Sequence, residues 1–281
     1  MLKQRDTIWF TVWLSGMALL WLWDFSFLNK PAFAQVQSGF VNTLIIAFTT
    51  IAMCLVLGWV SGISLYFLEK QRVRLPYLVL SFVLNLLRSI PQIVGVLMGY
   101  VVITLLLEKQ WLSGKWTVLI LIAFCISLFV FLELSDLIRE RIAYFRQRDF
   151  FNAMLVCGIK ESRIVNREVL WKNSLSHIFN KLISIFGITI FLQCSIDFII
   201  SVGLSSDVSA VNLPTTLGSL LAKIDSKQDI LAISHAIWNP GYFPNLFFEH
   251  LQGVTVAFII VFTLLCVYKI ANGFSQRHDL A

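Results

Sequence analysis

The side chains that could do catalytic chemistry are scattered through the 281 residues of this chain rather than grouped in a motif. No two cysteines have metal-binding or redox spacing, and we expect all five to be small buried hydrophobic residues: Cys54, Cys125, Cys157, Cys194 and Cys266. The four histidines are equally dispersed, and the chain has no HExxH motif, no Gly-x-Ser-x-Gly elbow and no phosphate-binding loop. The sequence therefore predicts that the chain is not an enzyme and binds no cofactor or metal. If ATP drives it, another chain must hydrolyse the ATP.

Composition indicates an integral membrane protein. Hydrophobic residues make up 58% of the chain, charged residues only 14%, and the mean hydropathy is +0.79. A spanning helix needs roughly 20 consecutive apolar residues. Segments of that length cover residues 8–28, 40–68, 76–107, 116–137, 182–204 and 251–274. We therefore expect an all-α, polytopic membrane helix bundle with about six transmembrane helices.

The basic residues predict the orientation. Most Lys and Arg lie near the two chain ends or in the loops around residues 69–75 and 138–181. Only five lysines fall on the opposite side: Lys30, Lys109, Lys115, Lys223 and Lys227. Short loops rich in Lys and Arg stay in the cytoplasm. Both termini are therefore expected there, and the formal charge of +6 needs no nucleic acid partner to explain it.

The first apolar segment has two interpretations. Lys3 and Arg5 as the charged region and the Ala-Phe-Ala sequence at 32–34 as the cleavage site would suit a signal peptide. The segment is nevertheless of spanning length and rich in tryptophan, which favours membrane interfaces, and it carries Asp24. We expect a retained membrane anchor.

Charged residues within apolar segments are costly and often functional. Glu133 and Asp136 lie close in sequence to Arg139 and Arg141, which predicts a local ion network rather than a role in transport.

Arg88, Pro91 and Asp197 are candidates for the substrate pathway. Asp197 could meet a cationic group of a substrate, or it could pair with Arg88 or stay neutral and hydrogen-bonded. Pro91 removes a backbone hydrogen bond and predicts a bent helix. Gly95 and Gly99 follow on one face, and this smooth side is expected to pack across a dimer interface or to line a gate.

The segment from 149 to 173 is the largest basic loop and predicts two short helices around a glycine. Asp149 is expected to cap the first helix, and Gly158 suits the left-handed position that ends it. A second amphipathic helix is expected from 161 to 170. The pair could lie on anionic lipid or could insert into a partner protein.

These residues resemble the cytoplasmic loop of the permease subunits of bacterial ATP-binding cassette importers. That loop reads Glu-Ala-Ala, a glycine four residues on, and then Ile-x-Leu-Pro. The alignment on Gly158 places residues 152–154 at Glu-Ala-Ala and residues 169–171 toward Leu-Pro, with the glutamate, the third small residue and the proline replaced. The resemblance implies ATPase-coupling roles for Asn152, Ala153, Met154, Gly158, Ile164 and Leu170.

The resemblance also implies the partners and the location. These are cytoplasmic ATPase subunits that use the ATP, a second permease subunit, an extracytoplasmic substrate-binding protein, and the lipid of the bacterial cytoplasmic (inner) membrane. The divergent loop suggests a heterodimer in which the companion permease carries the stronger coupling signal.

Further stretches extend the resemblance from residue 40 onward. Residues 42–62 are similar to the opening permease helix, and 86–91 to the segment that bends at proline. The tail pattern over 203–244 resembles the dipeptide and oligopeptide permeases, although Ser205 and Leu217 replace their glycine and tryptophan. Their longer outer segment after the first helix is also missing.

The resemblance implies a domain organisation and a substrate class. An anchor and outer linker would cover 1–38, a permease core 39–274 with its coupling loop at about 138–181, and a cytoplasmic tail 275–281. Peptides are the first expectation for the substrate, with polar amino acids, phosphonate, polyamines and nickel as alternatives. A stand-alone channel or secondary transporter, or a structural membrane subunit, are the competing classes.

The outer stretch from 205 to 246 is too long for an ordinary connection and predicts a function of its own. In an importer it would cover the outer mouth and meet the binding protein. The alternative is an interfacial helix anchored by Trp238, Tyr242 and Phe243.

Overall fold

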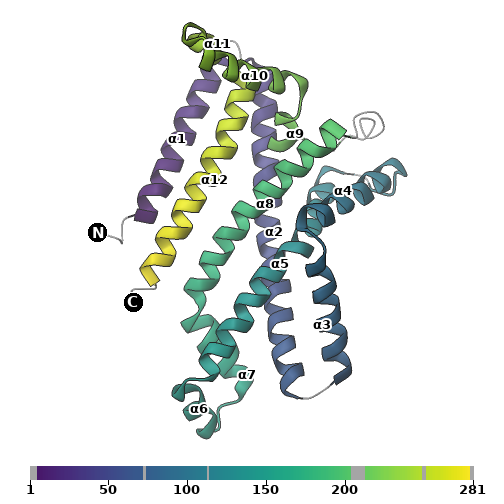
Figure 1. Ribbon diagram of the computed structural model, residues 1–281, viewed down its shortest axis with the longest axis vertical. Coiled ribbons are helices and arrows are strands. Elements are labelled where there is room, and N and C mark those ends of the chain that lie inside the picture. The colour runs from purple at the N-terminus through teal and green to yellow at the C-terminus, as the bar shows by residue number, and fades with distance from the viewer. Residues whose placement is uncertain (1–4, 72–73, 113, 204–212, 249–250, 279–281) are drawn as a thin grey trace.

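A computed structural model describes residues 5–71, 74–112, 114–203, 213–248 and 251–278, and every regular element in these ranges is helical (Figure 1). The long helices are α1 (Arg5–Phe27), α2 (Lys30–Lys70), α3 (Arg74–Ser89), α4 (Gln92–Glu108), α5 (Lys115–Arg146), α8 (Leu175–Gly203) and α12 (Leu251–His278). The shorter elements are α6 (Asp149–Val156), α7 (Glu161–Arg163), the π-helix η2 (Ile164–Asn173), α9 (Leu217–Leu221), α10 (Ile224–Trp238), the 3-10 turn η4 (Pro240–Tyr242) and α11 (Phe243–Phe248).

The expected polytopic all-α bundle is confirmed. Within the described residues, five helices are long and apolar enough to span a membrane: α1, α2, α5, α8 and α12. The α3–α4 pair makes a sixth candidate, bent by 95° at the break. Pro91 stands at the N-cap of α4, so the predicted bend lies where the proline removes a backbone donor.

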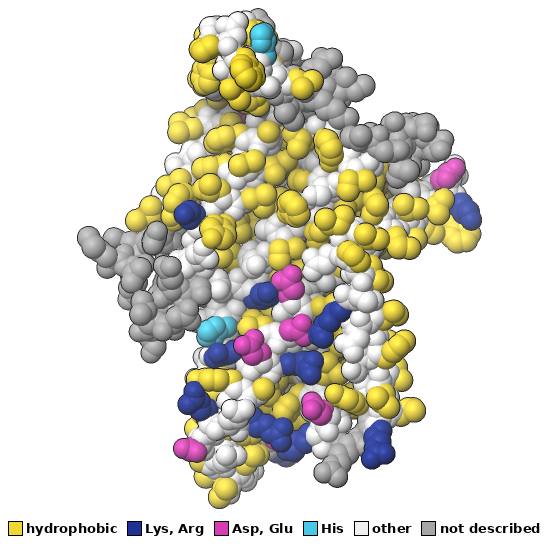
Figure 2. All heavy atoms as spheres, viewed as in Figure 1, with side chains coloured by type: hydrophobic (Ala, Val, Ile, Leu, Met, Phe, Trp, Pro, Cys, Tyr) yellow, Lys and Arg dark blue, Asp and Glu magenta, His cyan; other side chains and the backbone are white. Residues whose placement is uncertain are grey.

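The two sides of the bundle differ in charge. The N and C termini lie at the same end of α1 and α12, on the side toward which the α6–α7 loop points (Figure 1). On the face drawn in Figure 2, most Lys and Arg gather in the lower half, around that loop, and a largely hydrophobic band covers the upper half. This distribution agrees with the predicted orientation, and we refer to the α6–α7 side as the cytoplasmic side. The tail at 279–281 and the Leu204–Ser205 part of the tail pattern lie outside the described residues.

α2 is longer than expected. Its 41 residues correspond to about 60 Å, twice the hydrocarbon thickness of a bilayer. It therefore reaches the outer loops at one end and the cytoplasmic loop at the other. α5 likewise continues to Arg146 and α8 begins at Leu175, so the loop expected at about 138–181 is shortened at both ends to residues 147–174.

Small residues let α2 and α4 approach α5 closely. A Cβ on Gly58 or Gly62 would meet Leu134 or Ile138 at 3.0 or 2.9 Å. One on Gly95 would come within 2.3 Å of the Phe129 ring. The expectation that Gly95 and Gly99 face a second permease is therefore wrong, because α5 of the same chain already occupies that side.

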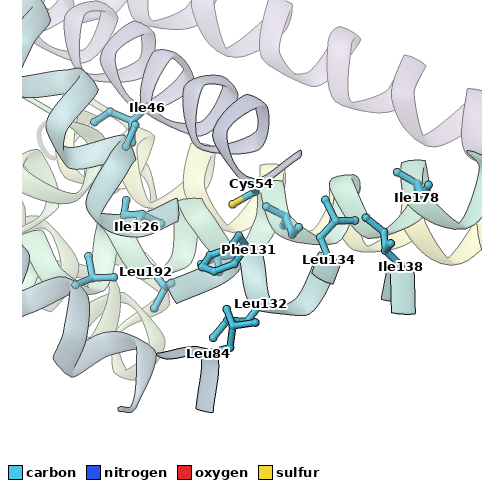
Figure 3. Close-up of a cluster of buried hydrophobic side chains, with 14 of the residues drawn as sticks. Ile46, Cys54, Leu84, Ile126, Phe131, Leu132, Leu134, Ile138, Ile178 and Leu192 are labelled. Carbon is cyan, nitrogen blue, oxygen red and sulfur yellow. The ribbon is translucent and has the colours of Figure 1, made fainter. Parts of the chain in front are cut away.

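The main hydrophobic core lies between these helices (Figure 3). Its buried side chains come mainly from α2, α5 and α8, and α3, α4, α6 and η2 add others, among them Leu84, Tyr100, Phe151 and Ile164. A second core links α1, α9 and α12 to the outer part of α2 and α8. The bundle thus holds both the cytoplasmic loop and the outer segment against a common frame.

The predicted ion network uses different partners. Glu133 lies 2.8 Å from Lys181 of α8, and Asp136 is paired with Arg88 of α3. The expectation that both acids pair with Arg139 and Arg141 is wrong, because Arg88 of α3 and Lys181 of α8 are their salt-bridge partners. The sequence predicts ion pairs only between residues that are close together on one helix, and both observed pairs join different helices.

Candidate functional site: the cytoplasmic loop

The loop begins with α6, which ends at a left-handed glycine. Gly158 has φ +79°, its N–H donates to the Leu155 carbonyl, and the Ile159 N–H donates to the Met154 carbonyl. These two bonds form a Schellman motif, for which glycine is the favoured residue. The predicted role of Gly158 in ending the helix is confirmed.

Two local predictions in this loop are wrong. Arg148, not Asp149, is the N-cap, and Asp149 lies in the first turn, where its charge faces the positive end of the helix dipole without a side-chain cap bond. Cys157 is exposed rather than buried, and it lies at the C-cap of α6, beyond the last helical residue.

The second helix is mostly a π-helix, whereas the sequence predicts an amphipathic α-helix over 161–170. After Glu161–Arg163 the chain continues as a π-helix over Ile164–Asn173. Its buried residues come in two pairs five positions apart, Ile164 with Val165 and Val169 with Leu170. A hydrogen-bond step of five residues keeps both pairs on one face, and π-helical turns are rare and frequent at functional sites.

Three side-chain contacts join this second helical part to α2. The Tyr66 hydroxyl donates to Glu161 Oε1 at 2.5 Å, and Lys70 binds the other carboxylate oxygen. Further up α2, Trp59 Nε1 donates to Asn166 Oδ1 at 3.2 Å. These contacts were missed from the sequence, because nothing local to Glu161 shows that the end of α2 lies beside it.

The electrostatics favour an ionised Glu161. Partial burial raises the pKa of the carboxyl, but hydrogen bonds from Lys70 and Tyr66 and the charges of Lys70 and Arg146 outweigh it. The pKa of Glu161 is therefore below its ordinary value. The contact with α2 is expected to hold throughout the neutral range.

This contact predicts a pH dependence. A lowered folded-state pKa means that the stabilisation by Glu161 is present above the ordinary pKa of 4.5 and is lost as the pH falls through the folded-state value. Hydrogen exchange of η2, corrected for intrinsic rates, should be slow at pH 7 and should accelerate at strongly acidic pH. Glu161→Gln should exchange faster than wild type at pH 7, with the difference vanishing in acid.

Glu168→Gln is the matched control for this measurement. Glu168 forms a local pair with Lys172 within η2 and leaves the α2 contact intact. Equal exchange in all three proteins at pH 7 would show that Glu161 does not hold the loop.

The predicted coupling residues fall into two groups. Asn152, Ala153 and Gly158 are exposed on α6 and its turn. Ile164 and Leu170 are fully buried, and Met154 is partly buried against the core, so these three hold the loop to the bundle. Coupling roles for all six stay predictions.

A cavity of about 670 Å³ opens where α2 and α5 end beside this loop. It is lined by Tyr66, Glu69, Asp136, Arg139, Glu140, Ala143, Arg146 and Gln147. The walls alternate acids and bases, so the cavity has no strong preference for a ligand of one charge.

The candidate pathway residues lie at different depths. Arg88 and Asp136 form their pair on the surface of α3 and α5, with side-chain exposures of 37% and 50%. Asp197 is buried and accepts a hydrogen bond from the Thr216 hydroxyl, so it pairs with Thr216 and not with Arg88. Pathway roles for Arg88, Pro91 and Asp197 stay predictions.

The outer segment around α9 is bound to α2. Asn42 Nδ2 donates to the Thr215 carbonyl at 2.6 Å, and the Leu217 N–H donates to Thr43 Oγ1 at 3.1 Å. Gly218 packs so tightly on α8 that a Cβ would lie 2.7 Å from the Cys194 Cα. The sequence did not single out Asn42 or Thr43 as anchors, although buried polar residues in an apolar helix are a signal for such contacts.

A multi-helix bundle with a helix–glycine–helix loop on its basic side agrees with the permease resemblance of the sequence. Residues 54–277 match the family model described as binding-protein-dependent transport system inner membrane component. This is most of the chain, so the protein belongs to that family. No curated protein matches the sequence.

Membership fixes the coarse function. The chain is a permease subunit of a binding-protein-dependent ATP-binding cassette importer and a multi-pass inner membrane protein. Such permeases work with ATPase subunits and substrate-binding proteins, and the family is a transport component rather than an enzyme class. α1 and the outer half of α2 precede the matched residues.

Proposed function

We propose that α6 and the turn at Gly158 dock into a cytoplasmic ATPase subunit and pass its movement to the bundle. One observation carries this proposal. α6 turns Asn152, Ala153 and Val156 outward, with Val156 89% exposed, while Phe151 on its other side is 1% exposed. The exposed side of α6 is therefore available to a partner, while the buried Phe151 fixes the helix to the bundle.

The chemistry of the free surface favours a protein partner. No charged residue lies between 150 and 159, although the neighbouring segments are basic. A helix that rests on anionic lipid would place Lys and Arg on that surface. An uncharged patch with a basic rim is better suited to an apolar pocket with acidic edges.

α2 supplies a route from the loop to the outer side. Its cytoplasmic end holds Glu161 through Tyr66 and Lys70, and its outer end holds the α9 segment through Asn42 and Thr43. Closure of the ATPase subunits on ATP would displace the loop, and α2 would carry the displacement to the outer segment. The loop must make different contacts in the two states, since a partner that binds both equally shifts neither.

The substrate pathway is assigned to the face that carries Arg88 and Asp136. An exposed ion pair within the depth of the spans is costly against lipid tails. Glu133, Lys181 and Gln92 add polar groups close by, with Gln92 Nε2 3.4 Å from Glu133 Oε1. This face would look onto a water-filled passage shared with a second, different permease subunit.

Peptides are the proposed substrates, on the resemblance of the tail over 203–244 to the dipeptide and oligopeptide permeases. A face with paired acids and bases suits a zwitterionic solute, which a peptide is. Polar amino acids, phosphonate, polyamines and nickel are the alternatives.

The test is copurification followed by ATPase assay. Purification of the chain from its native membrane should recover a cassette-type ATPase and a second permease. A peptide-loaded binding protein should then stimulate ATP hydrolysis by the reconstituted complex. Recovery of no ATPase would overturn the proposed docking, and stimulation by another solute class alone would overturn the peptide assignment.

A further inference from the structure

The outer layer formed by α10 and α11 buries two alanines and one leucine and leaves three large apolar side chains exposed. Ala232 and Ala236 pack with Leu246 in a small buried cluster. Leu231, Ile237 and Trp238 are 69%, 75% and 87% exposed. In water this arrangement would leave the largest apolar surfaces unburied.

The aromatic contacts of α11 fix the depth of this layer. The Phe248 ring lies 5.4 Å from Phe27 and 6.3 Å from Trp23, centre to centre. α1 ends at Phe27 and α12 begins at Leu251, so this is the level at which two spanning helices leave the bilayer. Figure 1 shows α10 and α11 lying over the outer ends of α1 and α12.

The exposed surface of the layer continues the surface that faces lipid. Leu22 and Phe25 of α1 are 66% and 76% exposed, and Val261 of α12 is 64% exposed. At the top of the view in Figure 2, hydrophobic side chains lie among white atoms and one His, above the hydrophobic band.

The composition of the layer also favours lipid. The charged residues of α10 are confined to its first half, at Asp225, Lys227 and Asp229, whereas residues 231–248 contain no Lys, Arg, Asp or Glu, and five of them are Phe, Tyr or Trp. Protein docking surfaces have a polar rim around their apolar centre. Aromatic residues without charges are typical of the interfacial belt of a membrane protein.

We propose that α10 and α11 form an interfacial collar that inserts Leu231, Ile237 and Trp238 into the outer leaflet, so that the partner of this surface is phospholipid. The collar fixes the outer ends of α1 and α12 at the bilayer surface. It leaves the contact with a substrate-binding protein to other outer residues. The inference stands independently of the proposed ATPase docking.

Spin labelling at position 238 tests the collar. The full chain with Cys157→Ser and Trp238→Cys is labelled and reconstituted in vesicles of phosphatidylethanolamine and phosphatidylglycerol, and Cys157→Ser alone measures background labelling. Two reference labels come from Val261→Cys on the lipid-facing side of α12 and Asn152→Cys on the exposed side of α6. We expect the label at 238 to be accessible to oxygen. It should be less accessible to a water-soluble paramagnetic chelate than the label at 152.

Ile237→Cys provides a second site in case either variant fails to insert. Accessibility to the chelate at both 237 and 238, equal to that at 152, would overturn the collar. The same applies if chelate accessibility is high in vesicles and falls only when a binding protein is added, because the surface would then belong to that protein. Neither outcome depends on ATP hydrolysis, so the collar can fail while the coupling proposal stands.

Discussion

Replacing Gly158 with proline is expected to remove most of the stimulation of the partner ATPase while the helix bundle stays folded. Proline fixes φ near −65° and has no N–H, whereas Gly158 has φ +79° and donates to the Leu155 carbonyl. The end of α6 would lose its Schellman motif and the docking surface would change direction. The bundle should tolerate the change, since a Cβ at Gly158 would meet nothing within 4 Å.

Gly158→Ala is the matched control. Alanine keeps the N–H and fits the space, but the left-handed conformation costs it roughly 1–2 kcal/mol. We expect a partial loss of stimulation with alanine and a loss of about tenfold or more with proline, equivalent to about 1.4 kcal/mol or more of coupling free energy. Stimulated and basal ATP hydrolysis in proteoliposomes would measure both. Stimulation of the proline variant at the wild-type level would contradict the assigned role of the turn.

Replacing Gly95 with leucine should destabilise the helix bundle. The first carbon alone would lie 2.3 Å from the Phe129 ring, so either this ring or α4 itself must shift. Overpacking of this kind costs about 1–3 kcal/mol or more. The amount of folded protein in membranes and its thermal stability in detergent should both fall.

Removal of the opposing ring tests the cause. Gly95→Leu combined with Phe129→Ala should recover stability relative to Gly95→Leu, because the leucine would occupy the space of the ring. An additive loss in the double variant would show that the close approach of α4 and α5 is not the reason. Gly241→Ala is a surface control, since its Cβ meets only Asn239 Oδ1 at 3.6 Å.

The bundle was predictable from the sequence because length and apolarity alone mark a spanning helix. The bend at Pro91 and the glycine that ends α6 were predictable for the same kind of reason, as each depends on the backbone chemistry of one residue. The π-helix was missed although its signal is present, since Ile164–Val165 and Val169–Leu170 repeat at a spacing of five that an α-helix pattern ignores.

The pairings between helices could not be predicted. Asp136 meets Arg88 and Glu133 meets Lys181 across 48 residues each, and Asn42 reaches Thr215 across 173. Such contacts depend on helix rotation and depth, which local patterns do not specify. The exposure of Cys157 was missed for a related reason, because hydrophobic character alone does not say which side of a short helix faces the bundle.

The outer stretch from 205 to 246 could be predicted only in part. Its length indicated a function, and the sequence left a choice between meeting a binding protein and lying at the interface. The inward alanines and the contact of Phe248 with Phe27 favour the interface for α10 and α11. α9 differs, because Asn42, Thr43 and Asp197 hold it in the bundle.

Site-specific photo-crosslinking from Ala153 in the assembled complex tests the central claim most directly. A photoreactive residue at 153 projects from the exposed side of α6, and one at 238 on the outer side serves as the control. The proposal predicts an adduct between position 153 and the ATPase subunit, with a yield that changes on addition of ATP, and no such adduct from 238. Absence of the adduct at 153 in a complex that still hydrolyses ATP would contradict the assignment of α6 as the docking element.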